Sequence, residues 1–340
     1  MHIGLHIKKN SNILDKKHKS VIIGVEEEVP MLGMSSISMF IIGPMNKNKI
    51  SMNLQGISKY CKERDITIWP HGSYLTAAIW NVNHANRHEN QSLIAIRTIK
   101  DHLVIGKQLS AKGIIVHLPR HTISDVLQTM EIISNCKVIN SIRKNEVDLP
   151  KFTIECPASR PNEDLTYETA PKLNNLVGAI IADTKINIPW NLCIDSAHQY
   201  AGGIDFGRAF DEWESALSDE TRARLALIHL NGASAKNFGT GKDFHIIPCS
   251  KEDAIWGHLI SDEFRIYMKT LGDDIDKING LNLYESMSDE EKNTIKTSTL
   301  YSMVRWAKKL DIDFILEINR GNYCDIKLIM DILNALSEAD

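Results

Sequence analysis

Eight short apolar runs, separated by longer amphipathic stretches, constrain the fold of this 340-residue chain more than any other feature. The runs are rich in Ile, Val, Leu and Phe, as strands buried on both faces are. Strands that alternate with helices predict a parallel sheet with right-handed crossovers, and eight of them can close a barrel. We therefore expect a single-domain (β/α)8 TIM barrel over residues 1–340. Its strands are expected at about 2–7, 36–43, 65–71, 113–118, 152–156, 190–197, 226–231 and 313–319.

Helical periodicity fills the segments between these strands, for example over 91–111, 122–135 and 326–336. The segment between the seventh and eighth strands is longer than one crossover helix needs. Its apolar spacing predicts a helix over 251–271, and a capping sequence that begins at Ser286 predicts another that continues to Leu310. We expect residues 260–295 to be an insertion outside the barrel, too acidic to bind phosphates directly.

Composition limits the partners that the chain can have. The formal net charge is −4, so a nucleic-acid surface would have to be a local patch. The six cysteines are scattered and form no Cys-x-x-Cys pair, which predicts reduced thiols, with Cys156 and Cys193 in the core. Without a transmembrane-length run or a leader before the first strand, we expect an intracellular protein with no membrane partner. It would act in the cytoplasm or nucleus, or in a virus factory or virion if it is viral.

Metal-binding residue types stand where the predicted strands end. Chemistry in such barrels lies at the carboxyl ends of the strands. Histidine, aspartate and glutamate make up about one residue in six, yet six consecutive strands end in one of them. The set comprises His71, His117, Glu155, Asp195, His198, His229, Asp243, His245 and Glu317. Five imidazoles and four carboxylates suit zinc or manganese, and buried carboxylates such as Glu155 and Glu317 need a cation nearby.

Other polar residues are expected to have ordinary structural roles. His6 ends the first strand and is expected to support the site without binding metal. Glu26, Glu27 and Glu28 are expected to form a solvated helix face. Simple hydrogen-bonded roles are expected for His84, His88, His102, His121 and His258.

Several segments around the nine residues resemble those of the endonuclease IV family, zinc-dependent AP endonucleases (AP endonuclease family 2). In chain order they are His71-Gly72-Ser73-Tyr74-Leu75, Cys193-Ile194-Asp195-Ser196-Ala197-His198, the Ala-Gly-Gly-x-Asp at 201–205, His229-Leu230-Asn231, Phe238-Gly239, Asp243-Phe244-His245 and Leu316-Glu317. The family counterparts include His-x-Ser-Tyr-Leu, Asp-Thr-x-His, His-Leu-Asn-Asp and Asp-Arg-His. The resemblance runs from Ile3 to about Asp331.

This resemblance implies a DNA-repair endonuclease that acts on double-stranded DNA as a monomer. Such an enzyme hydrolyses the phosphodiester bond 5′ to an abasic site and leaves a 3′-hydroxyl and a 5′-deoxyribose phosphate. The nucleophile is a hydroxide that bridges two of three zinc ions. Carried over by position, the ligands are His71, His117 and Glu155 for the first zinc; Glu155, Asp195, His229 and Glu317 for the second; and His198, Asp243 and His245 for the third. Glu155, Asp195 and Glu317 are then the catalytic residues of the central metal pair.

The loops depart from the family more than the ligands do. The glycine-rich loop after the first strand is replaced by one with Lys8 and Lys9, and the loop after the second strand offers Lys47 and Lys49 where the family has an arginine. Residues 246–250 replace a Gly-Glu-Gly. We expect the four lysines and Tyr74, which matches a DNA-contacting tyrosine, to bind DNA.

The sequence also leaves three alternatives open. The first is a metal-dependent isomerase or epimerase of the xylose-isomerase-like barrels, which needs about four ligands and would leave Asp243 and His245 idle. The second is a repair endonuclease for ultraviolet lesions, and the third is a DNA-binding barrel that has lost activity. The complete set of nine ligands argues against the last two.

Overall fold

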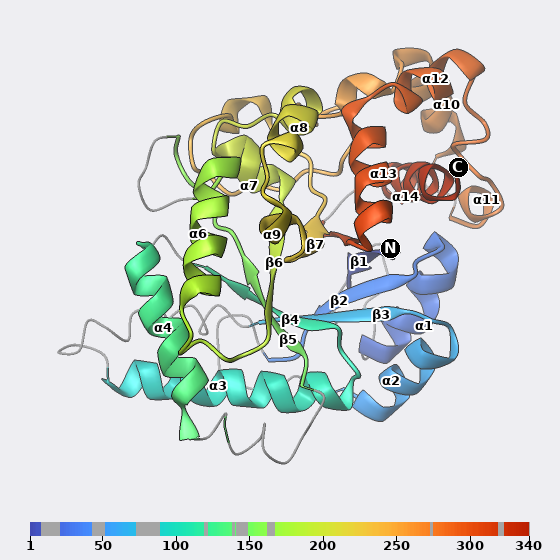
Figure 1. The fold of residues 1–340 in the computed structure, drawn as a ribbon. Helices are drawn as coiled ribbons and strands as arrows, with labels where there is room; N and C mark the ends of the chain where they lie inside the picture. Colours follow the sequence, from blue (N-terminus) through green and yellow to red (C-terminus); the bar gives the residue numbers. More distant parts are fainter. Residues whose placement is uncertain are drawn as a thin grey trace.

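A computed structural model of the chain shows a closed barrel of eight parallel strands, as predicted (Figure 1). The structure describes residues 1–7, 21–42, 52–72, 89–118, 122–137, 140, 149–161, 167–272, 275–318 and 323–339, with side chains described from residue 97 in the segment that starts at 89. Each strand pairs with its neighbours in the chain, and β1 pairs with β8 to close the barrel. The strands are β1 (Ile3–His6), β2 (Ser36–Phe40), β3 (Thr67–His71), β4 (Gly113–His117), β5 (Lys151–Glu155), β6 (Trp190–Asp195), β7 (Leu225–His229) and β8 (Asp313–Leu316). Their ends differ from the predicted ones by at most three residues.

Helices surround the strands, as Figure 1 shows. The helices before β7 are α1 (Val21–Leu32), α2 (Leu54–Glu63), α3 (Glu89–Gln108), α4 (Ile123–Asn135), α6 (Ala170–Ala182), α7 (Ser196–Ala201), α8 (Phe206–Ser215) and α9 (Asp219–Arg222). Those after β7 are η2 (Ala235–Asn237), η3 (Gly257–Leu259), α10 (Asp262–Leu271), α11 (Ile275–Asn279), α12 (Asp289–Lys296), α13 (Thr299–Leu310) and α14 (Tyr323–Glu338). Among the described helices, none has both the length and the apolar character that crossing a membrane requires.

The inside of the barrel is packed rather than open. Side chains from five strands form a cluster of their own there, made of Trp69, Ile115, Cys193, Leu227 and Ile315. Buried Asp313 accepts a hydrogen bond of 2.9 Å from Nε1 of Trp69 and so satisfies the one polar group of that ring. The rigid interior fixes where each strand ends, and with it the positions of the residues at the carboxyl rim.

The segment between β7 and β8 differs from the prediction in its helices. Ser261 caps α10, because its Oγ accepts a hydrogen bond from Phe264 N, so the helix begins at Asp262 and not near Lys251. Within the predicted capping sequence, Ser288 and Glu291 form a capping box at the start of α12. The single helix expected from there to Leu310 is wrong, because Ser298 caps a separate helix, α13.

That residues 260–295 are an insertion stays a prediction. The segment is well anchored, since Ile278 and Leu283 are fully buried in the main core. The backbone N–H of Leu283 also donates to Oδ2 of Asp331 on α14 at 2.8 Å.

One exposure prediction on α1 is wrong. Glu26 and Glu27 are exposed as expected, but Glu28 is buried on the same helix face as Val25 and Val29. Residues three and four apart share a helix face, so Glu28 follows its apolar neighbours into the interior.

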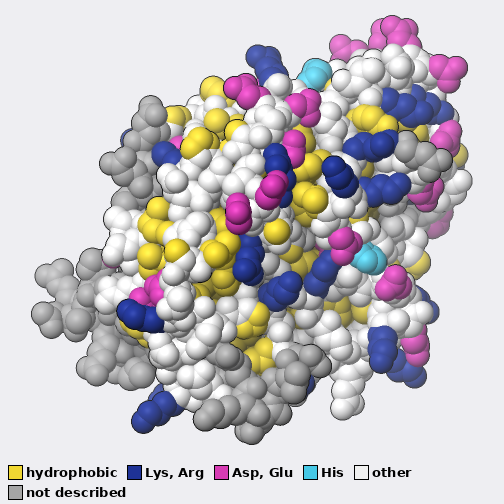
Figure 2. Space-filling view, viewed as in Figure 1, with side chains coloured by type: hydrophobic (Ala, Val, Ile, Leu, Met, Phe, Trp, Pro, Cys, Tyr) yellow, Lys and Arg dark blue, Asp and Glu magenta, His cyan; other side chains and the backbone are white. Residues whose placement is uncertain are grey.

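Surface charge is mixed on the face drawn in Figure 2, where basic and acidic side chains are interspersed around apolar ones. This agrees with the small net charge of the chain. This face therefore offers no broad basic surface to a polyanion.

Candidate metal centre

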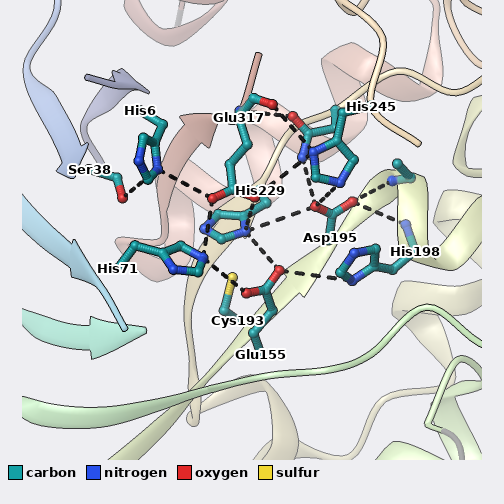
Figure 3. A network of polar contacts seen from close by, with 12 residues as sticks. His6, Ser38, His71, Glu155, Cys193, Asp195, His198, His229, His245 and Glu317 are labelled. Atoms are coloured by element: carbon teal, nitrogen blue, oxygen red, sulfur yellow. Dashed lines mark hydrogen bonds and ion pairs between the residues drawn. The ribbon is translucent and has the colours of Figure 1, made fainter. Parts of the chain in front are cut away.

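The predicted ligands meet at the carboxyl rim of the barrel. His71, His117, Glu155, Asp195 and His229 are the last residues of β3 to β7. The parallel register sets His117 beside Glu155 and Asp195 beside His229. Glu317 follows the last residue of β8 directly. Figure 3 shows most of these side chains pointing toward one another from their separate strands.

His71, His117 and Glu155 form the first group. The two Nε2 atoms are 3.1 Å apart, and Oε2 of Glu155 is 3.4 Å from Nε2 of His117 and 3.7 Å from that of His71. Tetrahedral zinc with ligands at about 2.1 Å sets those ligands roughly 3.4 Å apart. The three atoms are therefore already spaced as ligands of one zinc ion.

Glu155, Asp195, His229 and Glu317 form the second group. Nδ1 of His229 lies 3.0 Å from Oε1 of Glu155 and 3.3 Å from Oε2 of Glu317. Asp195 Oδ2 is 3.9 Å from the same nitrogen. Three carboxylates this close together in a buried place repel one another unless a cation lies between them.

The third group differs slightly from the set that the resemblance implies. Asp195, His198 and His245 offer atoms within 4.8 Å of one another, so Asp195 reaches both the second and the third group. Oδ1 of Asp243 is 2.8 Å from Nε2 of His245 and 3.4 Å from Nε2 of His198. Its side chain is 53% exposed, which places it on the solvent side of the centre.

Hydrogen bonds orient three of the histidines in one common way. Nδ1 of His71 donates to the carbonyl of Gly72 at 2.9 Å, Nδ1 of His198 to that of Cys156 at 2.9 Å, and Nδ1 of His245 to that of Glu317 at 3.3 Å. A carbonyl oxygen only accepts, so these Nδ1 atoms carry the proton in the neutral rings. The Nε2 lone pair is then directed into the site, as in histidines that bind zinc.

Unmet polar atoms also indicate a cation. Oε2 of Glu155 and Nε2 of His198 are buried and lack a well-oriented hydrogen bond within the described part of the chain, although charged partners lie within 4 Å. The donor set is nitrogen and oxygen only, which suits zinc or manganese. The residues present therefore fit a cluster of divalent metal ions.

The electrostatics of the centre agree with this fit. Burial opposes a charge on His245, but Asp195, Asp243 and Glu317 together raise its pKa to about 9. Burial alone would raise the pKa of Glu155, yet His117 and His229 hold it well below its usual range. Burial lowers the pKa of His117 to about 4. Without metal, a proton on His245 balances part of the negative charge of the carboxylates, and a cation can take the place of this proton.

No protein-family model matches the sequence, and no curated protein sequence matches it. Solved structures do match the fold. AsfvAP, from the structure described as AsfvAP:AG, is 18% identical over 98% of this chain and 97% of that chain, with a TM-score of 0.66. Endonuclease IV from Thermus thermophilus is 18% identical over 99% of both chains, with a TM-score of 0.62. An L-ribulose 3-epimerase is 10% identical over 99% of this chain and 94% of that chain, with a TM-score of 0.54.

The chain shares its barrel with endonuclease IV. It also shares that barrel with the epimerase, and at these identities the likeness shows the fold alone. A choice between the two chemistries has to come from the metal centre.

Asn231 links the carboxylate of Asp195 to the backbone of Glu317, and the sequence pattern alone does not indicate this role. Its Nδ2 donates to Oδ2 of Asp195 at 2.7 Å, and its Oδ1 accepts a hydrogen bond of 2.9 Å from Glu317 N. In the sequence the residue stands out only as part of His229-Leu230-Asn231. His6 lies where a supporting role was expected, with Nδ1 3.5 Å from Oε1 of Glu317 and 3.3 Å from Oγ of Ser38 (Figure 3).

The remaining predicted residues divide into two sets. His102 is buried in α3 and donates to the Thr98 carbonyl at 2.6 Å, which agrees with a structural role. His258 lies in η3. Outside the described residues are Lys8, Lys9, Lys47, Lys49, Tyr74, His84, His88 and His121.

Asp253 holds the loop that carries Asp243 and His245, and sequence reasoning missed it. Its buried carboxylate accepts four backbone hydrogen bonds of 2.9–3.1 Å, from Ala233, Cys249, Ile255 and Trp256. A Cβ at Gly232 would lie 2.6 Å from Cγ of Asp253, so glycine makes room for this carboxylate.

Asp253→Asn is expected to lower the free energy of unfolding by roughly 3 kcal/mol, because an amide leaves about two buried N–H groups without an acceptor. The variant should also bind less zinc, since the loop positions Asp243 and His245. Urea denaturation and elemental analysis measure the two effects. The exposed neighbour provides a control, Glu252→Gln, which should match the parent. Equal stability of Asp253→Asn and the parent would contradict this account of the loop.

Proposed function

We propose that the chain is a zinc-dependent DNA-repair endonuclease that hydrolyses the phosphodiester bond 5′ to an abasic site. The products would be a 3′-hydroxyl and a 5′-deoxyribose phosphate. The observation that carries the proposal is the third ligand group, in which Asp195, His198 and His245 converge beside the other two. An epimerase needs about four ligands, and a third group would have no purpose in it. Three metals suit phosphoryl transfer, where attacking and leaving oxygens both need charge stabilisation.

Bound zinc ions would supply an activated water nucleophile and would neutralise charge on the reacting phosphate. The residues of the chain set the geometry. Glu155 and Asp195 each belong to two groups and so fix the spacing between neighbouring metals. Asn231 keeps the carboxylate of Asp195 and the backbone of Glu317 in register.

The exposed ligands indicate the side from which substrate enters. The side chain of Asp243 is 53% exposed and that of His117 is 21% exposed, whereas Glu155 and His229 are fully buried. A phosphate therefore approaches between the first and third groups. Four carboxylate ligands do not balance three divalent cations, so the loaded centre is positive and attracts a phosphodiester.

The remaining parts of the proposal rest on the sequence. We assign contacts with the DNA to Tyr74 and to Lys8, Lys9, Lys47 and Lys49, on the loops that follow β1, β2 and β3. Each lysine–phosphate contact would add about one unit to the salt dependence of binding. The protein would act on double-stranded DNA as an intracellular monomer.

The test is incision of a duplex that contains one tetrahydrofuran analogue of the abasic sugar, with zinc-loaded protein. Incision on the 5′ side of the analogue is expected, and a DNA polymerase should extend the new 3′ end. The same preparation is tested on ketose sugars for epimerisation. Epimerisation without incision would overturn the proposal in favour of the sugar-converting alternative.

A further inference from the structure

Two phenylalanine rings are exposed on the loop between β7 and α10, which also carries two candidate ligands. The chain has eight phenylalanines, and six of them are buried or half-buried. Phe238 and Phe244 are 49% and 52% exposed. Phe244 stands between two candidate ligands, Asp243 and His245. Exposed aromatic rings lose the stabilisation of burial, so two of them on one loop at a site indicate a binding surface.

The loop holds its rings in place. The backbone N–H of Gly239 donates to the Tyr200 carbonyl at 3.2 Å, and that of Gly241 donates to the Ala201 carbonyl at 3.0 Å. Both glycines have positive φ, 65° and 70°, which side chains disfavour. The ring of Phe238 also meets that of Tyr200 edge to face at 4.9 Å. The backbone is thus fixed by contacts with α7, and the rings are presented to solvent by a structured loop.

Phe244 and His245 both line a cavity of about 870 Å³, which continues along Ile246 and Lys251 to α10. Its size is that of a site for a small organic group such as a nucleotide. The ring is therefore next to an open space that also reaches a ligand of the metal centre.

Lysines near the Phe244 ring favour a nucleic acid as the occupant. The loop, residues 230–261, carries three lysines, Lys236, Lys242 and Lys251, and three carboxylates, of which Asp243 is a candidate ligand and Asp253 is buried. Glu252 is then the one exposed carboxylate of the loop, outside the candidate ligands, that opposes the lysines. Nζ of Lys236 lies 5.8 Å from the ring centroid of Phe244. Aromatic rings among cationic side chains are how proteins bind unpaired strands.

We propose that Phe244 stacks on an unpaired nucleobase of the DNA held at the metal centre. The inference rests on the proposed function and adds to it the means by which the DNA is held open. An abasic site leaves a base without a partner, which lowers the cost of unstacking that base. In the resembling segment of endonuclease IV the middle residue is arginine, so the ring is a feature of this chain.

The test is a double-mutant cycle, in which the Phe244 ring and one DNA base are removed singly and together and the affinities are compared. The zinc-loaded wild-type protein serves as the parent, and the duplexes carry a non-hydrolysable linkage 5′ to the analogue so that bound DNA stays intact. Affinity is measured for a tetrahydrofuran duplex and for duplexes that lack, in addition, one nearby base at a time, including the base opposite the analogue. Phe244→Leu should weaken binding to the first duplex about tenfold, within the range for loss of one stacked base. On one of the duplexes that lack a further base, Phe244→Leu should bind as tightly as the parent, because the base that Phe244 contacts is absent.

Two variants serve as controls. Phe244→Trp keeps an aromatic face and should bind like the parent. Ile181→Ala removes an exposed apolar side chain, 44% exposed, at the end of α6 that leads into the start of β6, away from the metal centre. It should leave every affinity unchanged.

An equal loss on all duplexes, or no loss with Phe244→Leu, overturns the stacking proposal. If the wild-type protein binds abasic and undamaged duplexes alike and incises neither when the linkage is hydrolysable, the proposed function has failed instead. The two failures are therefore distinguishable.

Discussion

Replacing Glu155 by glutamine is expected to reduce incision of abasic DNA by more than about a thousandfold while the barrel stays folded. The carboxylate belongs to two ligand groups, with Oε1 3.0 Å from His229 and Oε2 3.4 Å from His117. Glutamine keeps the shape of the side chain but not its charge, so binding of the central pair of metals is weakened. A bound metal stabilises the transition state by several kcal/mol. Loss of about 4 kcal/mol of this stabilisation slows the reaction about a thousandfold.

Single-turnover incision and elemental analysis measure this loss, and circular dichroism checks the fold. Glu26→Gln changes an exposed glutamate on α1 in the same way and should be without effect. Glu317→Gln should behave like Glu155→Gln, since Glu317 also belongs to the second group. Near-normal turnover in either of these ligand variants would show that the ligand assignment is wrong.

Strong chelation is expected to abolish incision and to lower the melting temperature by on the order of 10 °C. The ligands are mostly buried, so the metals should leave slowly and brief exposure to EDTA should have little effect. Once they leave, repulsion among the clustered carboxylates is no longer balanced. Tight metal binding stabilises the folded state by about 4 kcal/mol at a thousand times Kd, which sets the size of the shift.

Added zinc should restore both incision and the melting temperature. Magnesium should not, because Mg²⁺ prefers oxygen ligands to imidazole. The two measurements are thermal unfolding followed by calorimetry and incision after reloading. An unchanged melting temperature in protein shown to be metal-free would contradict a metal centre built into the rim.

The barrel could be predicted because its pattern is local. Each strand is a short apolar run, and each ends in a residue whose type stands out from its neighbours, as at Ile154-Glu155. The sharing of Asp195 between two groups could not be predicted, because it depends on the register of β6 against β7 and on the position of the later loop. Asn231 is missed for the same reason, since its partners are 36 and 86 residues away.

The wrong helix boundaries have a common cause, which is competition for backbone N–H groups. The apolar spacing after Lys251 predicts a helix, but Asp253 accepts the N–H groups of Ile255 and Trp256. Ser298 similarly ends one helix and begins another by accepting from Tyr301 N. Side chains that cap or bridge backbone groups override periodicity, and only the folded structure shows which ones do.

Metal stoichiometry, measured on the same preparation that incises a tetrahydrofuran duplex, decides whether the chain is a trinuclear zinc endonuclease. We expect three zinc ions per chain, incision 5′ to the analogue and an extendable 3′-hydroxyl. Fewer than two metals per chain in fully active protein, or three metals with no incision of the duplex, would contradict it.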